Sequence, residues 1–155
     1  MCEYSDRKEQ AFGSGVAAHL GTPRLPRGDG AQASLRGAMR VLVVEDDDLV
    51  RTVAVDALED AGFEVIEAAT AEEAIDRCEQ RRADVLLTEI MLSGTFDGWD
   101  LAEQCRSADP DLKVIYTTGY SLREQRPVPG SRLVEKPYRP TELVEVISAL
   151  SAQAG

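Results

Sequence analysis

Residues 84–94 read D-V-L-L-T-E-I-M-L-S-G, and this stretch decides the fold. Its apolar run is short, lacks polar alternation and is bounded by acids, as is typical of a parallel strand with both faces buried. The run ends at Glu89. What this carboxylate can do depends on the groups that neighbouring strands bring beside it.

Strand-like and helix-like segments alternate around this run. The expected strands are Val41–Val44, Glu64–Glu67, Asp84–Thr88, Leu112–Thr117 and Arg132–Glu135. The expected helices are Asp48–Asp60, a segment from Thr70 to Arg81, Gly98–Ser107, a turn or two near Ser121–Arg126 limited by Pro127 and Pro129, and Thr141–Ala152. This order predicts an α/β fold, with a doubly wound five-stranded parallel sheet covered by helices on both faces.

Several helix ends can be read from single residues. Thr70, followed by Glu73 three residues later, has the pattern of a capping box, and Gly62 supplies a C-terminal stop. We expect Asp48 to cap the first helix, since a carboxylate there also favours the helix dipole. The apolar face of that helix is expected to comprise Leu49, Val50, Val53, Ala54, Ala57 and Leu58.

Charge is unevenly placed along the 155 residues. The formal net charge is −11, yet residues 1–40 hold six basic against four acidic residues, so residues 41–155 carry the excess of acid. Such an acidic domain is a poor partner for phosphate backbones and anionic membranes, which argues against nucleic-acid binding. No apolar stretch approaches ~18 residues and no secretory signal is evident, so we expect a cytoplasmic protein that spans no membrane.

Residues 1–38 are rich in Gly, Ser, Ala, Arg and Pro and show no sustained period. We expect a flexible N-terminal tail there and a single domain at residues 39–155. The tail could reflect a start codon assigned too far upstream or a partner-binding extension. The cysteines, Cys2, Cys78 and Cys105, are odd in number and widely spaced, which fits neither a disulfide framework nor a zinc site and suits a reducing cytosol.

Polar side chains stand at the carboxyl ends of four expected strands. Glu45 and Asp46 follow the first strand, Glu89 the third, Thr118 the fourth and Lys136 the fifth. In a parallel sheet these ends converge on one crevice. Carboxylate oxygens suit Mg²⁺, while a lysine and a hydroxyl suit phosphoryl oxygens. The sequence therefore indicates phosphoryl chemistry on a carboxylate, with Mg²⁺ as cofactor.

Four motifs in this order resemble the receiver domain of two-component response regulators, the chemotaxis-type phosphorylation switch. They are V-L-V-V-E-D-D-D at 41–48, the stretch at 84–94 with D-G-W at 97–99, V-I-Y-T-T-G-Y at 114–120, and L-V-E-K-P-Y at 133–138. The resemblance covers residues 40–152 and implies a flavodoxin-like receiver fold with strand order 2-1-3-4-5. It also implies a phosphorelay, with a histidine kinase or a phosphotransfer protein as partner near the first helix, and it admits a homodimer.

The resemblance implies residue roles as well. The metal ligands would be Glu45, Asp46, Glu89 and the backbone carbonyl of Met91; phosphoryl chemistry would involve Glu89 at the phosphoacceptor position, Thr118 as the switch hydroxyl, and Lys136. Because no output domain follows Ala152, we expect any signal to leave through protein contacts.

Three features depart from the family pattern. The family has Asp where this chain has Glu89, and Leu133 stands where an aromatic usually moves with the switch hydroxyl. Tyr116 or Tyr120 could substitute for that aromatic, without support from spacing. The shortened helix before Pro127 also weakens the case for dimerisation through that face.

Glu89 is one methylene longer than the acceptor it replaces. A displacement of about 1 Å can cost ~10²-fold in an in-line reaction, so we expect weak or absent phosphorylation. The longer carboxylate would also lie where phosphoryl oxygens bind. Two outcomes stay open: a partial mimic of the active state, or an inert switch in which Glu89 merely pairs with Lys136.

Two other functions fit parts of the sequence. D-D-D-L-V at 46–50 matches the D-x-D-x-[TV] string of haloacid-dehalogenase-type phosphatases, but the chain is short for that fold and lacks an evident cap domain. We therefore expect no enzymatic activity. The alternative kept open is a phosphorylation-independent docking adaptor with a receiver fold.

Overall fold

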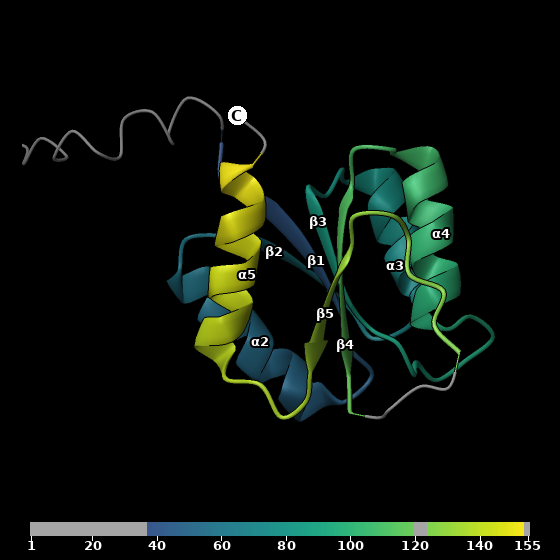
Figure 1. Ribbon diagram of the computed structural model, residues 1–155, viewed down its shortest axis with the longest axis horizontal. Coiled ribbons are helices and arrows are strands. Elements are labelled where there is room, and N and C mark those ends of the chain that lie inside the picture. Colours follow the sequence, from purple (N-terminus) through teal and green to yellow (C-terminus); the bar gives the residue numbers. More distant parts are fainter. Residues whose placement is uncertain (1–36, 120–123, 154–155) are drawn as a thin grey trace, which may run out of the picture. The chain divides into compact units, whose positions relative to one another are not determined.

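The computed structural model describes residues 37–119 and 124–153, whose strands form a parallel sheet (Figure 1). The strands are β1 (Arg40–Val44), β2 (Glu64–Ala68), β3 (Val85–Glu89), β4 (Lys113–Thr118) and β5 (Arg132–Glu135). They lie in the order β2-β1-β3-β4-β5, and every neighbouring pair is parallel. The expected sheet and strand order are confirmed. The tail predicted for residues 1–38 falls almost wholly outside the described residues and stays a prediction.

Within the described residues, a pair of helices covers each face of the sheet. These are α2 (Asp48–Asp60) with α5 (Pro140–Ala152) on one face, and α3 (Ala71–Gln80) with α4 (Gly98–Ala108) on the other. The bounds of these helices agree within one residue with four of the five expected helices, all but the one near Ser121–Arg126. None of the described helices has the length and apolar character needed to cross a membrane.

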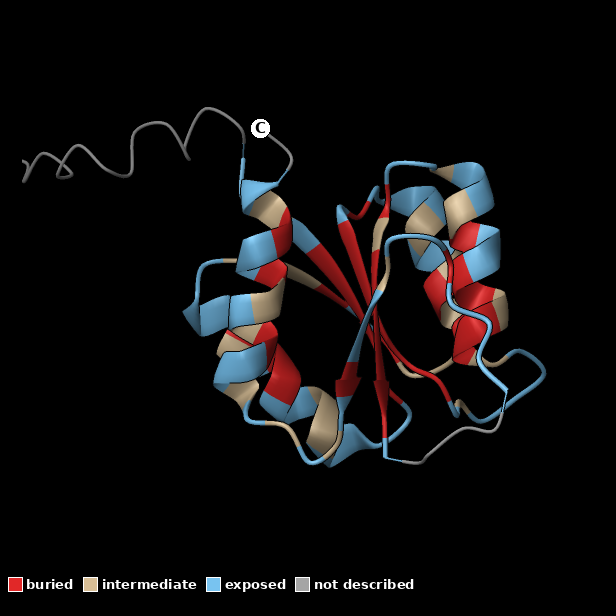
Figure 2. Ribbon diagram, viewed as in Figure 1, coloured by how far each residue is buried: buried red, intermediate tan, exposed pale blue. Residues whose placement is uncertain are grey.

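The sheet separates two apolar cores. Val41 and Val43 pack toward α2 and α5, whereas Leu42 and Val44 pack toward α3 and α4. Because successive side chains of a strand point to opposite faces, a strand covered on both sides is buried along its length. Figure 2 shows this burial in the central strands. It explains why the sequence shows continuous apolar runs rather than alternation.

The inward face of α2 differs from the one we expected. Ala54, Val55 and Leu58 are buried, whereas Leu49 and Val53 are 74% and 43% exposed. The helix meets the sheet through its Ala54–Leu58 stripe, so the pair one turn apart at Leu49 and Val53 falls on the solvent side. The prediction for these two residues was wrong.

The cap of α2 is Asp47 and not the expected Asp48. The carboxylate of Asp47 accepts hydrogen bonds from the backbone N–H groups of Leu49 and Val50, at 2.9 and 3.1 Å. Asp48 lies one residue inside the helix, where its carboxylate pairs with Arg51. Three consecutive aspartates fit the same capping pattern, so only the backbone path after β1 selects among them.

Two other helix ends follow the expectation. The hydroxyl of Thr70 accepts a hydrogen bond from the backbone N–H of Glu73 at 3.1 Å, which caps α3. Gly62 follows the end of α2 with φ at +93°, a conformation that favours glycine. The predicted cap at Thr70 and the predicted stop are confirmed, whereas the capping box is incomplete, because the Glu73 carboxylate accepts from the backbone N–H of Ala69 at 2.9 Å and not from that of Thr70.

The connection between β4 and β5 contains no helix in its described part, residues 124–131. The turn or two expected near Ser121–Arg126 lies partly outside the described residues. Val128 is buried, and its backbone N–H donates to the Tyr116 hydroxyl at 3.3 Å. Arg126 pairs with Asp97, the N-cap of α4, at 3.1 Å. This segment therefore packs along α4 without forming a helix in its described part.

Gly98 lies where α4 meets β3, and this contact yields a prediction. A Cβ at Gly98 would lie 2.3 Å from the carbonyl oxygen of Glu89 and 2.8 Å from the Cα of Ile90. Both are backbone atoms, so α4 or β3 would have to shift. We expect Gly98→Ala to lower the free energy of unfolding by roughly 1–3 kcal/mol, the usual cost of overpacking, measured by urea denaturation.

Gly119→Ala is the matched control. A Cβ at Gly119 would meet its nearest neighbour, the Cβ of Lys136, at an ordinary 4.0 Å. We expect a change within about 0.5 kcal/mol for this variant. Equal stability of the two variants would contradict the account of the α4–β3 contact.

Candidate functional site

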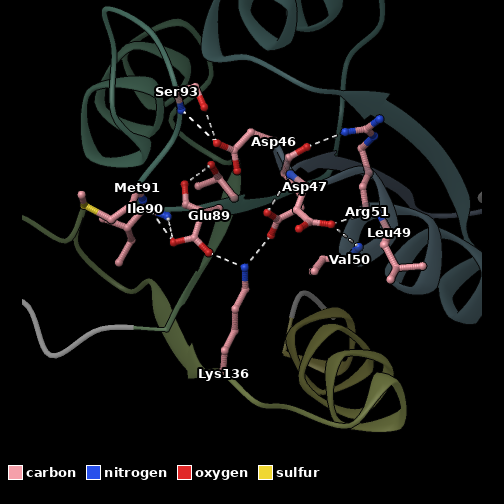
Figure 3. A network of polar contacts seen from close by, with 12 residues as sticks. Asp46, Asp47, Leu49, Val50, Arg51, Glu89, Ile90, Met91, Ser93 and Lys136 are labelled. Carbon is pink, nitrogen blue, oxygen red and sulfur yellow. Dashed lines mark hydrogen bonds and ion pairs between the residues drawn. The ribbon is translucent and has the colours of Figure 1, made fainter.

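The carboxyl ends of β1, β3 and β5 bring three charged side chains into contact (Figure 3). The Nζ atom of Lys136 lies 2.7 Å from Oε2 of Glu45 and 2.5 Å from Oε2 of Glu89. These residues are far apart in the chain, and only the parallel sheet unites them. The structure places them together as the strand-end rule predicted, while their chemical roles stay predictions.

Glu89 is the last residue of β3 and is only 6% exposed. Its Oε1 accepts hydrogen bonds from the backbone N–H groups of Ile90 and Met91, at 3.0 and 3.1 Å. Its Oε2 faces Lys136. Each oxygen of the carboxylate is thus already bonded within the protein. Three of the roughly four acceptor sites of the carboxylate are therefore used within the protein, which leaves one lone pair on Oε2.

Glu45, directly after β1, is 5% exposed. Burial raises the pKa of its carboxyl above the ordinary value, and the hydrogen bond and charge of Lys136 offset only part of that shift. For Lys136, burial favours the neutral amine, but hydrogen bonds to Glu45 and Glu89 hold its pKa above the ordinary lysine value. The lysine is therefore a permanent cation between two carboxylates.

Asp46 points away from this lysine and toward the loop after β3. Its Oδ2 accepts a hydrogen bond from the backbone N–H of Ser93 at 3.2 Å and another from the Ser93 hydroxyl. These bonds, the hydroxyl first, hold the pKa of Asp46 below its usual range. The predicted acidic pair is therefore divided, with Glu45 on Lys136 and Asp46 on Ser93.

The carboxylates at the strand ends are suitable ligands for Mg²⁺ in chemical type, but they are not arranged around a common position. Carboxylate oxygens are the ligands this ion prefers, and Glu45, Asp46 and Glu89 supply them. Among the residues that the structure describes, however, no group of three or more Asp, Glu, His or Cys side chains is arranged to hold a metal ion. A metal would have to compete with Lys136 and Ser93. The Met91 carbonyl, the fourth predicted ligand, stays a prediction.

Arg51 and Ser93 contact the site residues and were not predicted from the sequence. From α2, Arg51, which is labelled in Figure 3, donates a hydrogen bond to the backbone carbonyl of Glu45 at 2.7 Å. Its guanidinium also pairs with Asp48. It therefore closes the loop that carries Glu45 and Asp46. The spacing of three between Asp48 and Arg51 was a signal available in the sequence. Ser93 had none, because its partner Asp46 is distant in the chain.

Thr118 is buried at the end of β4, where its backbone carbonyl accepts a hydrogen bond from the Lys136 N–H at 2.7 Å. Leu133, at the aromatic position of β5, is exposed. Tyr116 packs in the core with its ring centroid 4.3 Å from that of Trp99. That packing and its hydroxyl contact hold the Tyr116 ring in place. Tyr120, the other candidate for the moving aromatic, lies outside the described residues.

The strand order, with acids after β1 and at the end of β3 and a lysine after β5, defines a receiver module of phosphorylation signalling. Residues 41–148 match the response regulator receiver domain, and the chain belongs to that family. Receiver domains are signalling modules, generally without enzymatic activity. They interact with histidine kinases or phosphotransfer proteins and generally bind Mg²⁺ at the phosphorylation site.

Relatives cover the same part of the chain. The response regulator receiver protein CpdR of Brucella abortus (strain 2308) is 32% identical over 115 residues, which span 72% of this chain and 95% of CpdR. The chemotaxis protein CheY of Thermotoga maritima is 26% identical over 117 residues, 72% of this chain and 97% of CheY. A receiver protein from Sinorhizobium medicae WSM419 superimposes with a TM-score of 0.70 at 28% identity, covering 74% of this chain and 95% of that one.

Because Lys136 contacts both Glu45 and Glu89, we expect the variant Lys136→Met to lose stability in a pH-dependent way. Removing one partner of a fully buried ion pair costs ~3–5 kcal/mol, and we expect about 2–3 kcal/mol here because the Lys136 side chain is 23% exposed. Loss of the cation raises the pKa of Glu45 further, so the folded state binds a proton more tightly than the unfolded chain. The stability of the variant is therefore greatest below the pKa that Glu45 has in the unfolded chain. It falls as the pH rises through the pKa that Glu45 has in the folded state.

Urea denaturation at about pH 5 and about pH 8 measures this difference between folded and unfolded pKa values. Lys113→Met is the control, because Lys113 begins β4 at the opposite end of the sheet and its loss changes the charge equally. We expect Lys136→Met to lose more stability than Lys113→Met, and the gap to widen at the higher pH. If the difference in free energy of unfolding between the two variants were the same at both pH values, the ionisation of the two carboxylates would not depend on Lys136.

Proposed function

We propose that this chain is a single-domain response regulator of a phosphorelay in which Glu89, at the phosphoacceptor position, accepts phosphate weakly or not at all. The observation that carries the proposal is the 2.5 Å contact between Glu89 Oε2 and Lys136 Nζ. The group expected to bind a phosphoryl oxygen is already paired with the chain's own carboxylate. The match to 95% of CpdR supports the single-domain part of the proposal.

Two effects of Glu89 oppose phosphorylation. A nucleophile displaced by about 1 Å loses ~10²-fold in rate when the reaction needs in-line geometry. In addition, the Glu89 oxygens already accept from two backbone N–H groups and face Lys136. A transferred phosphoryl group would need that lysine, which Glu45 also holds at 2.7 Å. The site therefore offers little free positive charge to a phosphoryl group.

The same contact supports a partial mimic of the active state. Glu89 places a negative charge on Lys136, as a phosphoryl oxygen would. A carboxylate carries one charge against about −1.5 to −2 for a phosphoryl group, so it imitates the modification incompletely. A bias of this kind shifts the population only by its different interaction with the two states. The proposal is thus a chain with some constitutive activity that responds little to a phosphodonor.

For the upstream partner we propose a histidine kinase or a phosphotransfer protein that docks on α2. Leu49 and Val53 support this surface, because they are exposed apolar residues one turn apart. Leu49 is the second residue of α2 and directly follows the loop that carries Asp46 and Asp47. We further propose that the protein is cytoplasmic and binds Mg²⁺ weakly. In this proposal the protein can form a homodimer and contacts neither nucleic acid nor a membrane.

A docking adaptor that no longer uses phosphorylation is the second candidate. The contacts of Asp46 with Ser93 favour it, since they direct one carboxylate away from the expected metal position. Lys136 engages the other two carboxylates. A receiver that stays in this arrangement at all Mg²⁺ concentrations would signal by partner binding alone.

The acceptor is tested by intact mass after incubation with phosphoramidate and Mg²⁺. We expect no added phosphate on the unaltered chain and one on Glu89→Asp, because the shorter side chain releases Lys136 and restores the acceptor position. Glu89→Gln is the control, since its amide cannot form an acyl phosphate by nucleophilic attack. Efficient labelling of the unaltered chain would overturn the proposal, as would labelling of Glu89→Gln.

Metal binding separates the two candidates. Trp99 is the chain's one tryptophan and follows Gly98, whose N–H donates to the carbonyl of Ile90 at 2.8 Å, so its fluorescence reports on the site. We expect Mg²⁺ to quench it weakly, with an affinity at least about tenfold lower than in Glu89→Asp, equal to ~1.4 kcal/mol. Quenching of Glu89→Asp with none of the unaltered chain would favour the adaptor.

A further inference from the structure

Two cysteines that are distant in the sequence meet between α3 and α4. The sulfur atoms of Cys78 and Cys105 lie 3.5 Å apart, and both are free thiols. Nothing in the sequence pairs them, because they lie 27 positions apart and the third cysteine leaves an odd count. The packing of the two helices produces this dithiol, on the sheet face that α3 and α4 cover.

A cavity gives small molecules access to the pair. Its volume is about 380 Å³, and both cysteines line it together with Ile75, Ala83 and Leu112. Cys78 is half-buried in this wall, whereas Cys105 is buried. The ion pair of Arg82 and Asp109, at 3.0 Å, also contributes to the lining. A reagent of a few atoms can therefore reach Cys78 first, with Cys105 behind it.

We propose that Cys78 and Cys105 form a thiol–disulfide site that hydroperoxides oxidise. The Cys78 thiolate attacks one oxygen of hydrogen peroxide, the O–O bond breaks, and with one proton the products are a Cys78 sulfenic acid and water. The Cys105 sulfur then attacks the Cys78 sulfur, the S–O bond breaks, and the Cys105 proton leaves with the hydroxyl group as a second water. Two thiols are oxidised, and one peroxide is reduced to two waters.

The environment assigns the two sulfurs these roles. The hydrogen bond with Cys105 lowers the pKa of Cys78, although burial and the charge of Asp109 act the other way. The same hydrogen bond, and then burial, raises the pKa of Cys105. Because the thiolate is the reactive form, Cys78 is the attacking sulfur and Cys105 the resolving one. The exposures of the two residues lead to the same assignment.

Bond formation requires a modest local movement. A disulfide has a sulfur–sulfur distance of about 2.0 Å, so the two atoms must approach by about 1.5 Å. The bond would tie α3 to α4, and α4 packs against β3 at Gly98. Oxidation would therefore stiffen one face of the sheet. This inference is independent of the phosphoryl chemistry proposed for the strand ends.

The test uses the full chain carrying Cys2→Ser, which leaves only this pair. The protein is treated with hydrogen peroxide, free thiols are blocked with N-ethylmaleimide, and tryptic peptides are analysed by mass. We expect residues 78–81 and 83–106 to appear as one linked species that separates on reduction, and the melting temperature to rise by roughly 5–10 °C. A control at the resolving position, Cys105→Ser, should instead accumulate a Cys78 sulfenic acid that dimedone traps.

Several results would overturn the inference. One is the detection of N-ethylmaleimide adducts on both cysteine peptides after treatment with a peroxide dose that oxidises free glutathione. Another is a disulfide that joins Cys78 residues of two molecules and no bond within the chain. A third is equal dimedone trapping with and without Cys105. Circular dichroism of each variant before oxidation ensures that the comparison is made on folded protein.

Discussion

One ammonium group between two buried carboxylates organises the carboxyl edge of the sheet. Lys136 reaches both Glu45 and Glu89, so a residue after β5 ties the end of β1 to the end of β3. Burial of Glu45 favours its neutral form and is the main cause of its raised pKa, which the hydrogen bond and the charge of Lys136 offset only in part. The charge of Glu89 adds the smallest contribution to the raised pKa of Glu45.

The shared lysine also accounts for the position of the third acid. Asp46 is adjacent to Glu45, but a further carboxylate beside Lys136 would add repulsion without adding a cation. Its carboxylate is instead bonded to the backbone and hydroxyl of Ser93, which lower its pKa. Receiver domains generally bind Mg²⁺ at this edge. Here Lys136 supplies part of the positive charge that the ion would otherwise bring, which stabilises its contacts with Glu45 and Glu89.

The sequence predicted what depends on strand and helix periods. Buried parallel strands read as apolar runs, and their carboxyl ends must share one edge, which is enough to bring Glu45, Glu89 and Lys136 together. Contacts that depend on tertiary packing could not be predicted from the sequence. The partner of Asp46 depends on the path of the loop after β3, and the meeting of Cys78 with Cys105 depends on how two helices pack. Each of these pairs is far apart in the chain and carries no periodic signal.

The single methylene that distinguishes Glu89 from aspartate acts on two groups at once. It moves the nucleophile by about 1 Å, and it brings Oε2 to 2.5 Å from Lys136. At that separation the carboxylate and the ammonium group form an ion pair, which engages the lysine within the protein. In the function we propose, the displaced nucleophile slows phosphorylation, and the same acid, paired with Lys136, supplies a partial substitute for the phosphoryl charge.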